Sequence, residues 1–133
     1  VRSGGTVTAY GWDLMGGGFP YELLRQALKA QNIRAPLPPS PHASSQDSLY
    51  QLWTQAGLQD IQQQEIIVER VFASFEEYWS IVLQAPSLGS ALAVLPSDQL
   101  SNLKELVRKS LTINAQGEVI CSGRANAIKG IVV

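Results

Sequence analysis

The chain has little of the chemistry that most metal, redox and nucleic-acid sites require. Its 133 residues include one cysteine and one histidine, so it has no internal disulfide and no metal site built from several such residues. Lys and Arg number 10 and Asp and Glu number 11, which gives a formal net charge of -1. Without a basic stripe, nucleic acid is a poor candidate partner. The low charged fraction of 16% indicates surface that is covered in the native assembly.

Long apolar runs are missing as well. No stretch approaches the ~20 consecutive apolar residues that a membrane span needs, so we expect no membrane partner. The chain opens with neither an initiator Met nor a charged-then-apolar signal peptide. The lone Cys121 fits a reducing compartment, so we expect a cytoplasmic protein. Hydrophobic residues make up 45%, which at this length allows one domain, or a large piece of one, to bury a core.

Turn residues divide the chain into alternating strands and helices. β-branched and aromatic runs predict three strands, near residues 6–12, 60–72 and 118–129. The first lacks clean polar alternation, which is typical of a strand covered on both faces, and we expect Tyr10 in the core. Apolar residues at helical spacing predict helices over 21–31, 46–55, 74–83 and 96–111, with a shorter one in 87–94. Ser74 and Glu77 match a capping box, and four prolines mark 32–45 as a loop.

Four short stretches occur in a recognisable order. They are residues 2–7 (Arg-Ser-Gly-Gly-Thr-Val), the pair Trp12-Asp13, residues 52–58 (Leu-Trp-Thr-Gln-Ala-Gly-Leu) and residues 72–79 (Phe-Ala-Ser-Phe-Glu-Glu-Tyr-Trp). In this order they resemble the C-terminal half of a class I S-adenosylmethionine-dependent methyltransferase, of the small-molecule type with a helical cap. The likeness covers nearly the whole chain, although each motif is weak alone. Ser3 departs from the pattern, because it stands where the family usually has proline.

The resemblance implies a fold and a division of the chain. The fold would be α/β, the C-terminal half of a Rossmann-like methyltransferase sheet. Its three strands would include a last one that runs antiparallel between the other two. Residues 1–133 would form a partial methyltransferase-like domain, and 74–111 a helical cap inserted between the last two strands. Ligands would lie at the carboxyl ends of the strands, as in other open α/β sheets.

The resemblance also implies what the chain does not carry. In the full-length parent, S-adenosylmethionine is held by the N-terminal half, through a glycine-rich turn and an acidic residue. The only glycine run here is Gly16 to Gly18, and no acidic residue follows it at the usual distance. We therefore expect no cofactor on this chain alone and interpret the run as a mobile active-site loop or a linker. The missing N-terminal half is an expected partner.

Two groups of residues are candidates for binding the methyl acceptor. Trp12 and Asp13 would end a central strand, where they would supply a wall and a polar contact or base. Tyr78, Trp79 and Val82 share one side of a cap helix and would line an apolar acceptor pocket. The alternatives are a packed Trp with a loop-capping Asp, and cap residues that only attach the cap. Neither Cys121 nor His42 is expected to act in catalysis, no catalytic residue is identified, and Arg124 is expected to be a solvated charge.

The sequence thus predicts the acceptor-binding part of a methyltransferase that acts on a small molecule and is inactive as an isolated chain. One alternative is a non-enzymatic dimerising or ligand-binding module derived from the same fold. Such a module would form a homodimer through exposed sheet surface. Another is an unrelated α+β domain that binds an apolar ligand under its helices. In that case the last strand need not lie between the other two. The identity of the acceptor is left open.

Overall fold

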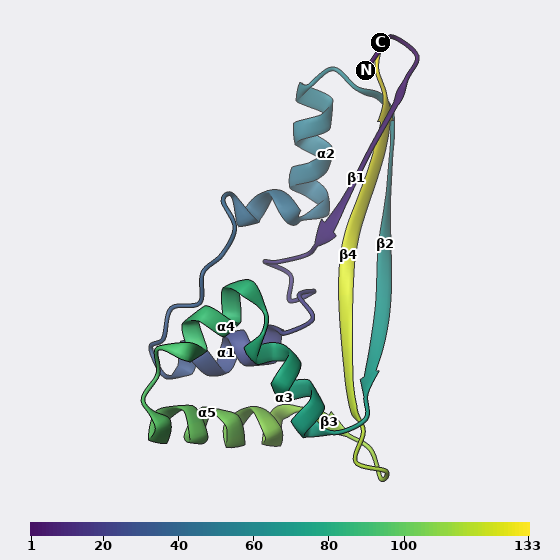
Figure 1. Cartoon of the computed structure of the whole chain (residues 1–133). Coiled ribbons are helices and arrows are strands. Elements are labelled where there is room, and N and C mark those ends of the chain that lie inside the picture. Colours follow the sequence, from purple (N-terminus) through teal and green to yellow (C-terminus); the bar gives the residue numbers. More distant parts are fainter. The chain divides into compact units, whose positions relative to one another are not determined.

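The computed structural model describes residues 1–133 as a mixed α/β chain with a four-stranded sheet and five α-helices (Figure 1). The chain divides into two compact units. We call the first the sheet unit; it comprises Val1–Pro20, Pro39–Val68 and Ser122–Val133. The second, the helical unit, comprises Tyr21–Pro38 and Glu69–Cys121. No helix of either unit combines the length and the hydrophobicity that crossing a bilayer requires.

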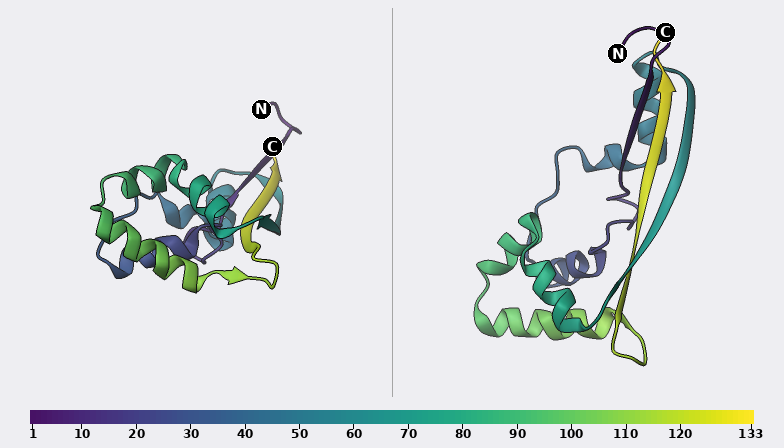
Figure 2. Two further views of the ribbon diagram at one scale, coloured as in Figure 1. Left: turned by 60° about the horizontal axis from the view of Figure 1, so that its bottom comes forward. Right: turned by 45° about the vertical axis from the view of Figure 1, so that its right-hand side comes forward.

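The sheet has the strand order that was expected. Its strands are β1 (Thr6–Trp12), β2 (Gln59–Phe72), β3 (Thr112–Ile113) and β4 (Val119–Ile131). β4 lies between β1 and β2 and pairs antiparallel with β1, so that Thr6 faces Ile131 and Trp12 faces Ala125. β2 also runs opposite to β4 (Figure 2). The prediction of a reversed last strand between the other two is therefore confirmed, whereas the place of this sheet in a larger one stays a prediction.

Three strands were predicted, and the fourth is a correction. β3 spans two residues and pairs with the amino-terminal end of β4, with Ile113 opposite Val119. Such a short segment leaves no periodic pattern in a sequence. The expectation that β1 is covered on both faces is also wrong, because most of its residues are exposed and Tyr10 is 81% exposed. A β-branched and aromatic composition reports strand propensity and not what lies over the strand.

The small residues of β4 allow its neighbours to approach closely. A Cβ atom at Gly130 would lie 3.2 Å from the Leu58 Cβ and 3.3 Å from the Trp53 Cε3. Trp53 belongs to α2 (Gln46–Gln55), which follows a 3-10 helix at Pro41–Ser44. The hydroxyl of Ser45 caps α2 by accepting from the Ser48 amide at 3.2 Å. Helix α2 thus covers one face of the sheet in this unit.

The helical unit contains α1 (Glu22–Ala30), α3 (Phe75–Leu83), α4 (Pro86–Ala93) and α5 (Ser97–Ser110). The last three fall within 74–111, as the sequence predicted, while their role as a cap stays a prediction. The capping box is confirmed: Ser74 Oγ accepts from the Glu77 amide at 3.1 Å, and Glu77 Oε2 accepts from the Ala73 amide at 2.6 Å. The core of this unit combines aliphatic and aromatic side chains, and its fully buried members are Leu24, Leu28, Phe72, Tyr78, Val82, Leu88, Leu92, Leu103, Val107 and Val119. Cys121 is buried as a small apolar residue, as expected.

We expect Gly123→Ala to destabilise the chain by about 1–3 kcal/mol, because the close contacts of β4 leave no room for a methyl group. The new Cβ would lie 2.8 Å from Trp12 Cζ3 and 2.9 Å from Pro20 Cγ, both of which belong to stiff rings. Gly11→Ala, on the exposed edge strand with open space around it, is the matched control and should stay within about 0.5 kcal/mol. Urea denaturation midpoints compare the two. Equal midpoints would contradict the packing described here.

Candidate functional site

The best-defined polar arrangement of the sheet unit lies where β1 ends. Residues 13–18 turn back there and bond to the backbone of Arg124 in β4. The Asp13 amide donates to the Arg124 carbonyl at 3.0 Å, and the Arg124 amide donates to the Gly18 carbonyl at 2.8 Å. The Gly18 amide closes the turn on the Asp13 carbonyl at 2.8 Å. We call residues 13–18 the glycine turn.

An ion pair fills the inside of the glycine turn. The Nη2 of Arg124 donates to Asp13 Oδ2 and to the Gly16 carbonyl, both at 2.8 Å. The other carboxylate oxygen of Asp13 accepts from the Gly16 amide at 3.0 Å. Burial alone would raise the pKa of Asp13, but the hydrogen bonds from Arg124 and Gly16 and the guanidinium charge together lower it below its ordinary value. Asp13 is therefore a stabilised carboxylate and a weak proton acceptor.

Each glycine of the turn is required for its own reason. A side chain at Gly16 would collide with the Asp13 carboxylate and the Arg124 guanidinium, and one at Gly18 would collide with the Arg124 carbonyl. Gly17 adopts φ +78°, which side-chain-bearing residues rarely do. The run is thus a closed, hydrogen-bonded turn and not a plain linker.

A second layer of polar contacts ties the proline-rich segment to this turn. Ser44 Oγ accepts from the Leu14 amide at 3.0 Å and donates to the Pro41 carbonyl at 2.7 Å. Asn126 Nδ2 donates to the Ser44 carbonyl at 2.8 Å, and a hydrogen bond from Asn126 also helps to lower the pKa of Asp13. The Asn126 side chain is fully buried, and its Oδ1 has no hydrogen-bond partner.

The glycine turn borders a small hollow and an aromatic side chain. The hollow has a volume of about 200 Å³ and is lined by Gly17, Gly18, Ile67, Ser122, Gly123 and Arg124. Trp12, the last residue of β1, is 36% exposed and stands next to Gly123. The geometry provides an aromatic surface beside fixed backbone groups, which suits binding and orientation better than proton transfer.

The structure distributes the five candidate acceptor-binding residues between the units. Trp12 and Asp13 belong to the sheet unit, and the contacts of Asp13 match the alternative of a loop-capping residue. Tyr78, Trp79 and Val82 belong to the helical unit and are 0%, 5% and 0% exposed. The Tyr78 ring packs against Phe72 at a centroid distance of 5.3 Å, and burial raises the pKa of Tyr78. Contact of any of the five with an acceptor stays a prediction.

Sequence reasoning missed Arg124 as a component of this site. It was expected to be a solvated charge, and that expectation is wrong: Arg124 pairs with a residue 111 positions away. It also missed Ser44 and Asn126. One signal was present, because Arg124 and Asn126 interrupt the otherwise small and apolar residues 119–128, where a polar side chain needs a partner.

Comparisons with known proteins find similarity in structure but not in sequence. No family model matches the chain, and no curated protein is similar to it in sequence. Among solved structures, the crystal structure of a putative methyltransferase from Bacillus halodurans matches with a TM-score of 0.42 and 10% sequence identity. The match covers 98% of this chain and 57% of that protein, so the chain spans little more than half of its length.

We expect Asp13→Asn to lower the free energy of unfolding by about 1–3 kcal/mol at pH 7, because it removes a charge-assisted hydrogen bond from a buried position. The native pKa of Asp13 lies below its ordinary value of 3.8, so its contribution is present above that pH. The contribution is lost as the pH falls through the native value, and the difference between variant and parent should vanish there. Urea denaturation at pH 7 and in acid measures this. Glu65→Gln is the control, since Glu65 is half exposed and 3.9 Å from Arg124 Nε; a pH-independent deficit in Asp13→Asn would contradict the assignment.

Proposed function

We propose that this chain is the acceptor-binding part of a methyltransferase that uses S-adenosylmethionine and acts on a small molecule. The observation that carries the proposal is the position of β4, reversed between β1 and β2. The resemblance required this order, whereas an unrelated α+β domain did not. Because β4 runs opposite to both of its neighbours, β1 and β2 run parallel to each other. Their carboxyl ends therefore point to the same end of the sheet, which is where α/β enzymes bind their ligands.

The arrangement at the end of β1 suits methyl transfer, which needs alignment more than it needs reactive side chains. Trp12 would form a wall against the acceptor. Arg124 and Asp13 would fix the glycine turn beside it, and because the pKa of Asp13 is lowered, we assign Asp13 a positioning or polar role and not that of a base. Tyr78, Trp79 and Val82 would meet the acceptor only if α3 moved, because all three are buried.

The residues present do not fit the cofactor itself. The only run of three glycines in the chain encloses the Asp13 carboxylate and the Arg124 guanidinium, so it has no room to approach S-adenosylmethionine. We therefore assign cofactor binding to an N-terminal half outside these 133 residues and propose that the chain alone is inactive. We also propose that the complete protein works in the cytoplasm.

Titration of the 133-residue chain with S-adenosylmethionine tests whether cofactor binding requires the proposed N-terminal half. We expect no heat of binding at micromolar concentrations, because the chain offers no cradle for the cofactor. A longer polypeptide that carries the proposed N-terminal half should bind S-adenosylmethionine and transfer its methyl group.

In that longer polypeptide, Trp12→Ala should raise the KM for the acceptor and leave cofactor affinity unchanged. Tyr50→Ala, at a half-exposed position on α2, is the control and should change neither. Micromolar binding by the short chain would refute the proposal, as would the absence of binding by the longer one.

A non-enzymatic dimerising module is the second candidate. The observation that favours it is the exposure of apolar side chains on the strands of the sheet unit, among them Tyr10 at 81% and Ile67 at 72%. Exposed apolar surface of this kind points to an interaction surface.

A further inference from the structure

One face of the sheet unit is not covered by α2. The register of β1 and β4 places Thr6, Thr8 and Tyr10 opposite Ile131, Lys129 and Ala127. Alternate residues share a face, so these six side chains lie on the same side of the sheet. Gly130 and its neighbour Trp53 mark the other side, which α2 covers. We call the first side the open face.

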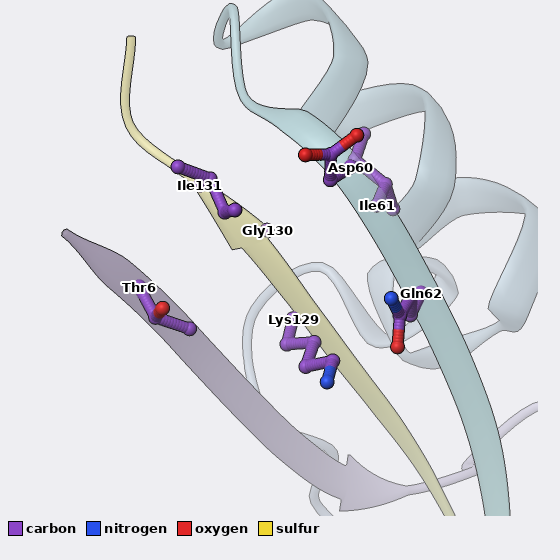
Figure 3. A pocket seen from close by; sticks show the side chains of 7 residues that line it. All are labelled: Thr6, Asp60, Ile61, Gln62, Lys129, Gly130 and Ile131. Atoms are coloured by element: carbon purple, nitrogen blue, oxygen red, sulfur yellow. The ribbon is translucent and has the colours of Figure 1, made fainter. Parts of the chain in front are cut away.

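Two hollows lie side by side on the open face. The larger, about 420 Å³, is lined by Thr6, Asp60, Ile61, Gln62, Lys129, Gly130 and Ile131 (Figure 3). The second, about 280 Å³, runs from Lys129 and Gln62 to Tyr10, Ala127 and Ile66, and Thr8, Gln63 and Gln64 also line it. Because the two hollows share Gln62 and Lys129, they form one depression, and its two charged residues lie at the end of the larger hollow.

The charged end holds one cation and one anion without partners. Lys129 and Asp60 are both exposed, and neither takes part in an ion pair. In Figure 3 the Lys129 ammonium and the Asp60 carboxylate do not point toward one another. Asp60 adopts φ 50°, in the left-handed region that Asp tolerates better than most residues, and this turns the start of β2 away from a regular strand. The depression therefore carries both signs of charge at the same place.

We propose that the open face binds a second copy of this chain. A two-fold axis through the larger hollow would bring Lys129 of each protomer to the partner's Asp60, and the two contacts would be equivalent. An interface of this type must be complementary to itself, and a surface with one cation and one anion meets that condition. A purely acidic or purely basic partner would leave one of the two charges desolvated and unpaired, which is costly.

The apolar side chains of the open face also favour binding of a second copy of the chain. Tyr10 and Ile66 supply exposed apolar surface, which favours association of two sheets packed face to face. The inference concerns the 133-residue chain and does not rest on the proposed activity.

Sedimentation velocity of the chain over a range of concentrations tests the proposal. We expect a dimer with a micromolar dissociation constant. Lys129→Glu and Asp60→Lys should each weaken it by at least about tenfold, because two attractive contacts become repulsive. An equimolar mixture of the two variants should dimerise again, since every contact across the mixed interface joins opposite charges. Lys109→Glu, at an exposed position of α5, is the control and should change nothing.

A further variant guards against misfolding, since Asp60 lies in the left-handed region. Asp60→Asn keeps a residue that tolerates this backbone and removes only the charge. It should weaken the dimer while leaving the circular dichroism spectrum unchanged. A chain that stays monomeric at every concentration would overturn the proposal, as would a mixture of Lys129→Glu and Asp60→Lys that fails to restore the dimer. Neither result would bear on whether the complete protein transfers methyl groups.

Discussion

The pairing of β4 with its neighbours is the constraint on which the sheet depends. β4 is the only strand that contacts all the others, so its backbone satisfies donors and acceptors of β1, β2 and β3 together. Successive side chains of β4 point to opposite faces of the sheet, so the register of this strand also decides which residues each face presents. One face carries Arg124 and Asn126 to the glycine turn and leaves room for Trp53 at Gly130, while the other presents Lys129 beside the hollows. A slip of one residue would exchange these two sets.

The ion pair between Asp13 and Arg124 holds the glycine turn in one backbone conformation. Glycines give up more backbone freedom on folding than other residues, so a turn of three needs strong local contacts to be ordered. Arg124 supplies them through both its backbone and its guanidinium. Arg124 and the Gly16 amide each occupy one oxygen of the Asp13 carboxylate. The end of β1 thereby has a fixed backbone, and its last residue, Trp12, lies against Gly123 of β4.

The sequence predicted what local patterns and the family resemblance encode. The capped start of α3 followed from the Ser74–Glu77 box, and the strand order followed from the resemblance. Tyr10 was misplaced because strand propensity does not report what covers a face. The partner of Arg124 was missed because it lies 111 residues away, and no periodicity connects positions at that distance. The hollows and the charges of the open face also depend on the register between strands, which only the fold reveals.

The lone thiol of the chain has a consequence for its chemistry. Cys121 lies near the amino-terminal end of β4, and burial raises the pKa of its thiol, which keeps it protonated and poorly nucleophilic. Alkylating reagents and oxidants therefore reach it mainly when this end of the strand separates from its surroundings. Since there is no second cysteine, the labelling rate is a direct measure of how often the protein opens there.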